Sequence, residues 1–421
     1  MRTVYPIGTT IYNPAKCWGG YTVLNAYRRS GKRSAARVMQ SGEEEEGEGG
    51  DVGAVLPVEE REISIIDMNG NFVHGWDLGA MRCPILFQNG NLLTASTTGR
   101  NTTGWSLEGR LVEVDWEGNP VWSVSPPVSP HAAGATAERL ENGNTLFLYK
   151  VLLPDAYRMK IADPEARNRD GLLFDCIAEA APDGDILWNW KSYEHLDLDG
   201  WQRNDPGPNM THFNNIQSLP ENRWYDAGDE RFRPGNILVS PRNLGFIFIL
   251  SKETGEIVWR YSGERMGGLS GQHSPIMIEK GLPGEGNILV FDNGQSPLRF
   301  HKHGGQTVVL EIDPTKTYFG KGTEIVWSYG NGFLFYNSYG GHCERLPNGN
   351  TLITESHTCR VFEVTAEKEI VWEFVWDPAP WRLIMDASRI PYDHCPQLAA
   401  MPSPEEKEVV PPPHTALKPY E

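Results

Sequence analysis

Four of the 11 histidines in this sequence stand at matching positions, each at the start of a predicted strand. The four are His131, His212, His273 and His342. Imidazole can act as a nucleophile, a general acid or base, or a metal ligand, and its ordinary pKa lies near neutrality. Titratable groups that converge in a cleft are typical of functional sites. If the fold brings these side chains together, they form a candidate site.

Arg242 and Asn214 add groups that can hold an anion. Asn214 lies two residues after His212, and Arg242 follows the next predicted strand. A guanidinium group can bind two oxygens of a sulfate, phosphate or carboxylate, and an amide can donate to the same anion. A salt bridge for Arg242 and a turn cap for Asn214 are the structural alternatives.

A short strand pattern that ends in tryptophan recurs along the chain and predicts the elements that position these residues. The pattern occurs six times, ending at Trp76, Trp122, Trp188, Trp259, Trp327 and Trp372. A strand of matching length precedes each copy, and a third strand that begins with Gly-Asn recurs five times. Short, repeated antiparallel strands separated by turn residues predict the blades of a β-propeller.

The sixth copy of the Gly-Asn strand is missing before Ile63, and residues 20–24 near the N-terminus take its place. The opening strand of that blade must then come from the C-terminal end of the chain. Ring closure of this kind protects the sheet edges. We therefore predict an all-β protein, a single six-bladed β-propeller over residues 1–400 closed by an N-terminal strand. Independent sandwich domains would need longer linkers between the repeats.

Two segments differ from the repeats. Residues 28–57 run from a basic stretch into Glu43-Glu44-Glu45-Glu46 and several glycines, a composition that predicts a mobile charged loop in the first blade. Residues 401–421 are rich in proline and predict an extended C-terminal tail.

The composition limits the partners and the location. A net charge of −17 argues against binding to nucleic acid or to an anionic membrane surface, since such binding depends on clustered Lys and Arg. No apolar run is long enough to span a bilayer, and no signal region opens the chain. We expect a cytoplasmic protein, or an exported one if the sequence has been shortened. The composition is compatible with an oligomer.

The cysteines predict no metal site. All six are scattered and none forms a C-x-x-C pair, so a structural zinc site is not expected.

Several motifs resemble those of the aryl-sulfate sulfotransferases that work without a nucleotide sulfate donor. The resemblance covers nearly the whole chain, including the N-terminal residues 5–14. Its motifs are His212-Phe213-Asn214-Asn215, Val239-Ser240-Pro241-Arg242-Asn243, Gln272-His273-Ser274 and Phe291-Asp292-Asn293-Gly294. Pro241 and Asn243 replace a serine and a histidine of the family pattern, and residues 223–234 form an insertion.

The resemblance implies that a sulfuryl group moves from an aryl sulfate to a phenolic acceptor by a ping-pong mechanism, with no cofactor or metal. His273 would be the histidine that becomes transiently sulfurylated. Arg242, Asn214 and His212 would form the oxyanion clamp. His131 or His212 would serve as the acid and base.

We further predict that His342, Phe213 and Tyr339 contact the substrate, because they lie near the same strand starts. Two other classes of function remain open. The converging imidazoles are also suited to a metal-dependent lyase or hydrolase. A non-catalytic propeller that binds a ligand is the second alternative.

Overall fold

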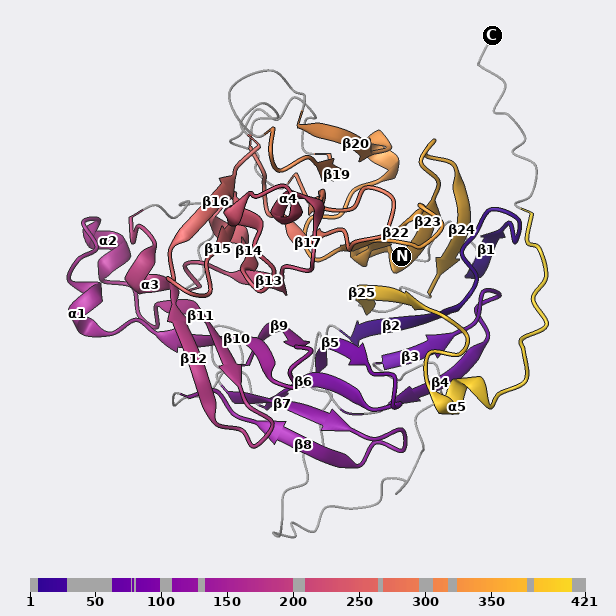
Figure 1. Cartoon of the computed structure of the whole chain (residues 1–421), viewed down its shortest axis with the longest axis horizontal. Helices are drawn as coiled ribbons and strands as arrows, with labels where there is room; N and C mark the ends of the chain where they lie inside the picture. Colours follow the sequence, from indigo (N-terminus) through magenta and orange to yellow (C-terminus); the bar gives the residue numbers. More distant parts are fainter. Residues whose placement is uncertain are drawn as a thin grey trace, which may run out of the picture.

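The structure is a computed structural model that describes residues 7–28, 63–76, 78, 81–98, 108–127, 133–199, 209–263, 268–294, 306–316, 324–376 and 382–410. Within these ranges the strands form six antiparallel sheets arranged in a ring (Figure 1). The all-β, six-bladed prediction is confirmed. The predicted charged loop after Arg28, residues 411–421 and His131 lie outside the described residues.

Each blade runs outward from a strand at the ring's centre. The six blades, from inner to outer strand, are β25 (Arg382–Ile390), β2 (Tyr21–Arg28), β3 (Ile63–Ile66), β4 (Phe72–Trp76); β5 (Met81–Leu86), β6 (Leu92–Thr98), β7 (Glu108–Val114), β8 (Pro120–Val124); β9 (Ala133–Arg139), β10 (Thr145–Leu152), β11 (Leu173–Ala180), β12 (Ile186–Lys191); β13 (Phe213–Ser218), β14 (Ile237–Pro241), β15 (Ile247–Leu250), β16 (Ile257–Tyr261); β17 (His273–Met277), β18 (Ile288–Asp292), β19 (Val308–Ile312), β20 (Ile325–Tyr329); and β21 (His342–Arg345), β22 (Thr351–Glu355), β23 (Arg360–Val364), β24 (Ile370–Val375), β1 (Gly8–Tyr12).

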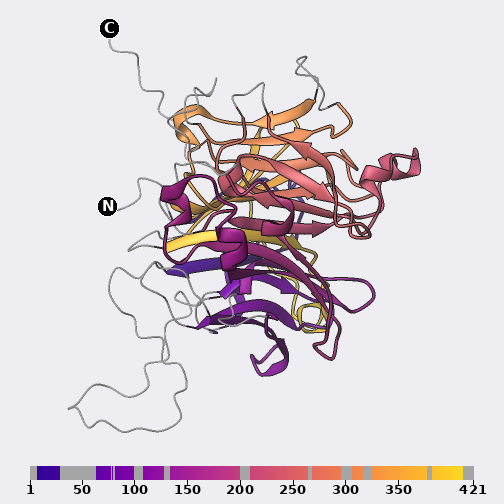
Figure 2. The ribbon, with the colours of Figure 1, turned by 90° about the vertical axis from the view of Figure 1, so that its left-hand side faces the viewer.

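Helices are few and short. They are α1 (Asp155–Arg158), α2 (Pro164–Arg167), α3 (Ser192–His195), α4 (Arg223–Asp226), α5 (Pro396–Ala399) and the 3-10 turns η2 (Glu230–Phe232), η3 (Arg242–Leu244), η5 (Gly332–Leu334) and η6 (Ser356–Thr358). None of the described helices has the length and apolarity needed to cross a bilayer. Figure 2 shows the ring from its edge.

The repeated tryptophans join neighbouring blades. In each described blade, an indole N–H on the outer strands donates to a turn carbonyl of the next blade. The donors and acceptors are Trp76 to Asp115, Trp122 to Pro182, Trp190 to Gly255, Trp259 to Pro314, Trp327 to Ala366 and Trp372 to Met68. In the third blade Trp190 donates, rather than the aligned Trp188. The last bond closes the ring, since Trp372 and Met68 belong to the last and first blades.

Both ends of the chain meet at this closure. Strand β2 pairs with β25 from Tyr21 opposite Ile390 to Arg28 opposite Arg382, and β1 adds a strand to the edge of β24. The buried Arg389 on β25 donates to Thr22 Oγ1 and to the Trp18 carbonyl, at 2.9 and 2.7 Å. N-terminal and C-terminal segments are thereby held in one sheet.

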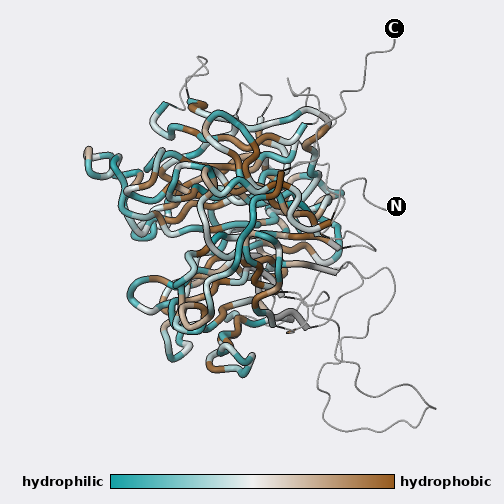
Figure 3. Tube along the Cα trace, turned by 90° about the vertical axis from the view of Figure 1, so that its right-hand side faces the viewer, coloured by the Kyte–Doolittle hydropathy of each residue, from teal (hydrophilic) through white to brown (hydrophobic). Residues whose placement is uncertain are grey.

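The hydrophobic core is divided into layers between adjacent blades. One layer packs Leu238 and Ile249 against Val290 and Leu310 of the following blade. Another packs Leu148 against Val239. Figure 3 shows the corresponding hydrophobic stretches inside the ring and hydrophilic turns around it. Because each blade packs on its neighbours, the ring's axis is left for polar side chains.

Candidate active site

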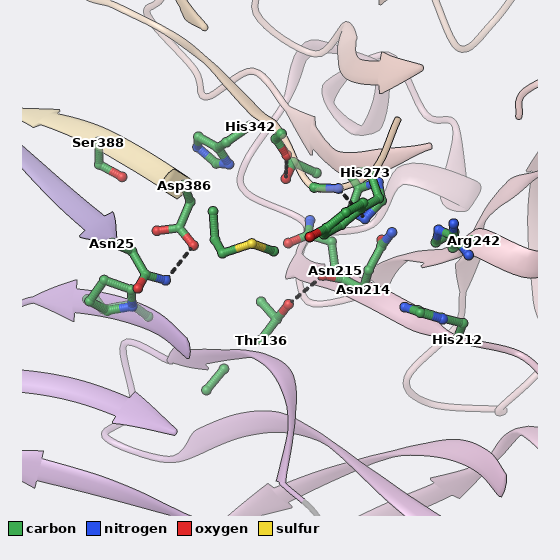
Figure 4. A pocket seen from close by; sticks show the side chains of 18 residues that line it. Asn25, Thr136, His212, Asn214, Asn215, Arg242, His273, His342, Asp386 and Ser388 are labelled. Atoms are coloured by element: carbon green, nitrogen blue, oxygen red, sulfur yellow. Dashed lines mark hydrogen bonds between the residues drawn. The ribbon is translucent and has the colours of Figure 1, made fainter. Parts of the chain in front are cut away.

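A cavity of about 470 Å³ lies where the inner strands meet (Figure 4). Residues from all six blades line it, which is the convergence that the repeat alignment predicts. Its volume lies within the range of small-molecule sites.

Most of the predicted site residues that the structure describes line this cavity. They are His212, Asn214, Arg242, His273, Tyr339 and His342. His131 lies outside the described residues.

The expectation for Phe213 was wrong. Its ring is 1% exposed and packs between Trp190 and Phe248, at centroid distances of 6.4 and 6.1 Å. The backbone of the preceding His212 has a positive φ of 50°. Phe213 is therefore a core residue of its blade and does not reach the cavity.

His273 is held in one orientation by hydrogen bonds to both ring nitrogens. Its Nδ1 lies 2.8 Å from the Asn293 Oδ1 and 2.8 Å from the Gly271 carbonyl, and its Nε2 accepts from the Gly340 N–H at 3.2 Å. A backbone N–H can only donate, so Nε2 carries a lone pair and Nδ1 carries the proton. The side chain of His273 is 9% exposed.

Asn293 fixes that tautomer. Its amide nitrogen donates to the carbonyls of Asn337 and Gly340, at 2.8 Å each, which leaves Oδ1 facing the His273 Nδ1–H. Asn293 is fully buried. A buried orienting group of this kind sets which imidazole nitrogen is available for chemistry.

Burial, together with the nearby Arg242 charge, lowers the pKa of His273 to about 3, and the hydrogen bonds to Asn293 and Gly271 oppose this shift only in part. The imidazole is therefore neutral at physiological pH. A neutral imidazole with an unprotonated Nε2 is a competent nucleophile.

This shift predicts a specific loss of stability in acid. Below the ordinary pKa of 6.5, the unfolded chain binds a proton at His273 that the folded protein does not, so the free energy of unfolding falls as the pH falls from 6.5 toward 3. At pH ~4.5 the loss from this residue should be roughly 3 kcal/mol. Urea unfolding of the wild type and His273→Asn at neutral and acidic pH measures it. An equal acid sensitivity of both proteins would contradict the assignment.

The turn that carries His212 is strained and is held by a buried polar network. His212 and Ser274 are two of the four non-glycine residues with positive φ in the described part of the chain, and both line the cavity. Such a backbone costs about 1–3 kcal/mol and persists where the surroundings fix it. Here Asp175 accepts from Thr211 Oγ1 at 2.7 Å and from the Phe213 N–H at 2.8 Å, and pairs with Lys150.

Asn214 and Arg242 complete this side of the cavity. Asn214 Nδ2 donates to the Gln272 carbonyl at 2.7 Å, which fixes the residue before His273 and leaves one amide hydrogen of Asn214 for a ligand. Arg242 follows β14 and opens η3; its N–H donates to the His212 carbonyl at 3.0 Å, and its Nη1 donates to Asn243 Oδ1 at 2.8 Å. Hydrogen bonds thus connect Asn214 to the residue before His273 and the Arg242 backbone to His212.

The opposite side of the cavity carries Asp386 and His342 (Figure 4). Burial lowers the pKa of His342, but Glu344, 3.9 Å away, and Asp386 outweigh burial and raise it. Burial also raises the pKa of Asp386, against the effects of His342 and a 3.0 Å hydrogen bond from Asn25 Nδ2. The described histidine, cysteine and carboxylate side chains form no group of three that could hold a metal ion.

Sequence reasoning missed Asn25 and Asp386, and it named Asn293 within a motif without giving it a role. Asp386 is an acidic residue within the otherwise largely apolar stretch Leu383–Ala387, which forms part of β25. The N-terminal part of the sequence supplies no innermost strand for the first blade. This gap indicated that a C-terminal segment must form that strand, and an innermost strand faces the channel.

Comparison with known proteins gives a family match and structural matches of low sequence identity. The Arylsulfotransferase (ASST) family matches residues 84–377. No curated protein matches the sequence. The matched residues run from within β5 to just past the end of β24 and therefore include both His273 and Arg242.

Two solved structures illustrate the structural similarity. A Bacteroides caccae protein of unknown function has a TM-score of 0.50 and 13% identity, covering 88% of this chain and 98% of its own. A virginiamycin B lyase from Staphylococcus aureus has a TM-score of 0.40 and 12% identity, covering 74% of this chain and 76% of its own. At such identities the first supports the fold alone, and the second supports no argument.

The family match spans well over half of the sequence and contains the inner strands that carry the described histidines of the cavity. This chain is an enzyme of the transferase class, and it belongs to the arylsulfotransferase (ASST) family.

Proposed function

We propose that this enzyme transfers a sulfuryl group from an aryl sulfate to a phenol through a covalent sulfo-histidine at His273. The observation that supports it best is the buried, neutral imidazole of His273, which has an unprotonated Nε2 and lines the same cavity as Arg242. A nucleophile beside an anion-binding guanidinium group suits attack on a sulfate ester.

In the first half-reaction the His273 Nε2 lone pair forms a bond to sulfur while the bond from sulfur to the aryl oxygen breaks. The long 3.2 Å contact from the Gly340 N–H to Nε2 gives way, and that N–H can then donate to a sulfuryl oxygen. Asn293 Oδ1 and the Gly271 carbonyl keep their bonds to Nδ1–H and stabilise the positive charge that develops on the ring.

Arg242, Asn214 and His212 face the sulfuryl oxygens in this proposal. Sulfuryl transfer, like phosphoryl transfer, depends mainly on in-line positioning and on donors aimed at the equatorial oxygens. His212 gives a proton to the departing phenolate and later accepts one from the acceptor phenol. His131 is a second candidate for this proton transfer. The acceptor oxygen then bonds to sulfur, the sulfur–Nε2 bond breaks, and His273 returns to its neutral form.

Acceptor dependence is the first test. With p-nitrophenyl sulfate as donor, we expect sustained release of nitrophenol only when a phenol acceptor is added, because the buried sulfo-histidine must react with an acceptor before the next turnover. The release is followed by absorbance, and the sulfated acceptor by mass spectrometry. Sustained release without an acceptor would indicate a sulfatase, and no release under either condition would count against aryl sulfates as donors.

A further inference from the structure

The cavity carries a guanidinium group at one end and a carboxyl group at the other. Figure 4 shows Arg242 and His212 at one end and Asp386 with Asn25 at the other, with His273 nearer the Arg242 end. The sulfuryl group belongs at the Arg242 end if the proposed function holds. The Asp386 end is therefore available for the part of the substrate that lies farthest from the reacting sulfur.

Asp386 and Asn25 provide hydrogen-bond acceptors at this end of the cavity. Asn25 Nδ2 donates to Asp386 Oδ2 at 3.0 Å, and no further hydrogen bond to Asp386 is found within the described ranges. Asn25 is 1% exposed, and its Oδ1 has no hydrogen-bond partner among the described residues. The Asn25 oxygen and the Asp386 carboxyl group can both accept a hydrogen bond from a ligand group that donates.

Asp386 is the carboxyl group that lines this end of the cavity. Burial raises its pKa, and His342, which lies 3.9 Å from Glu344, acts in the opposite direction. A ligand cation beside Asp386 would stabilise the ionised carboxylate in the same way as His342 does. The nearby Arg389 directs its guanidinium group away, toward Thr22 and the Trp18 carbonyl.

The lining of the cavity also suits an aromatic ring. Met385, Ile85 and Tyr339 are among the lining residues, and Tyr339 is held edge-on against His357 at a centroid distance of 4.4 Å. Thioether and aromatic side chains make favourable contacts with ring faces and edges. The cavity thus combines an anion site, apolar and aromatic lining residues, and a carboxyl group.

We propose that the Asp386 end selects phenols that carry an ammonium group, with Asp386 and Asn25 as the specificity-determining residues. This inference rests on the proposed function of the same cavity. An ammonium group has three donors and a positive charge, so it can satisfy the Asp386 carboxylate and the Asn25 oxygen. A carboxylate substituent could donate to neither oxygen and would repel the ionised Asp386 carboxylate.

Acceptor selectivity tests the proposal. Tyramine and para-hydroxyphenylacetate are phenols of similar size with opposite charge, and para-ethylphenol is the neutral reference. For the wild type we expect kcat/KM to be about tenfold or more higher for tyramine than for para-hydroxyphenylacetate, mainly through KM. In Asp386→Asn the ratio should fall toward one, and in Asp155→Asn, an exposed aspartate on α1, it should stay at the wild-type value.

Direct binding separates this proposal from the proposed function. Calorimetric titration of the wild type with tyramine and with para-hydroxyphenylacetate needs no sulfate donor, so a tyramine preference that depends on Asp386 would stand even if no sulfuryl transfer occurred. If Asp386→Asn does not fold, Asp386→Ser replaces it, with thermal melting as the check. A preference for the carboxylate phenol, or a tyramine preference that survives both substitutions, would overturn the proposal.

Discussion

Replacing His273 with asparagine is expected to lower the turnover of aryl sulfate by at least about 10³-fold, because asparagine has no nucleophilic nitrogen. The rapid release of about one equivalent of phenol in the absence of acceptor, which marks a covalent intermediate, should disappear as well. Asparagine can still donate to Asn293 Oδ1, the partner of the His273 Nδ1, so the surrounding network has a replacement donor. Stopped-flow absorbance with p-nitrophenyl sulfate measures both quantities.

His195→Asn is the matched control for this experiment. His195 ends α3 and stacks on Trp190 at a centroid distance of 4.8 Å, outside the set of residues that line the cavity. It should keep the wild-type rate and the initial release. An active His273→Asn protein would show that a different histidine carries the sulfuryl group.

Substituting Arg242 by lysine is expected to lower kcat/KM by roughly 10²- to 10³-fold while the melting temperature stays close to that of the wild type. Lysine keeps the charge but replaces the planar fork with a single ammonium point charge, so it cannot hold two sulfuryl oxygens together. The partly buried Arg242 sits on η3, where its backbone N–H bond to the His212 carbonyl is kept in the variant.

Arg233→Lys controls for the loss of a guanidinium group. Arg233 pairs with Glu230 at 2.6 Å on an exposed turn, so its replacement should change neither rate nor affinity. If Arg242→Lys retains full activity, the role of Arg242 in binding the sulfuryl group is contradicted, and its contact with Asn243 becomes the better account of the residue.

The fold could be predicted because every blade repeats the same short sequence pattern. A tryptophan near the end of each outer strand donates to the next blade, and this requirement recurs at every blade. The same periodicity placed His212, His273 and His342 at equivalent strand starts, so their common cavity followed from the alignment. Arg242 and Asn214 could be added because they lie on the same blade as His212.

The parts of the site that sequence reasoning missed depend on contacts between distant segments. Asn25 and Asp386 lie on strands from opposite ends of the chain, and only their pairing in one sheet places them in the cavity. Asn293 orients His273 through a side-chain bond that no spacing rule reveals. Phe213 was assigned to the site by its proximity in sequence to His212, but the positive φ of His212 changes the direction of the chain at that point.

Locating the covalent group is the most direct test of the central claim. The enzyme would be mixed with an aryl sulfate, without acceptor, quenched and digested at or above neutral pH, since a sulfo-imidazole is labile in acid. Peptide mass mapping should find the mass of one sulfuryl group on the peptide that contains Gly271, Gln272 and His273, and the group should leave when a phenol is added before quenching. A label on the peptide that contains His342 or His212, or no label during acceptor-dependent turnover, would contradict the assignment of His273 as the nucleophile.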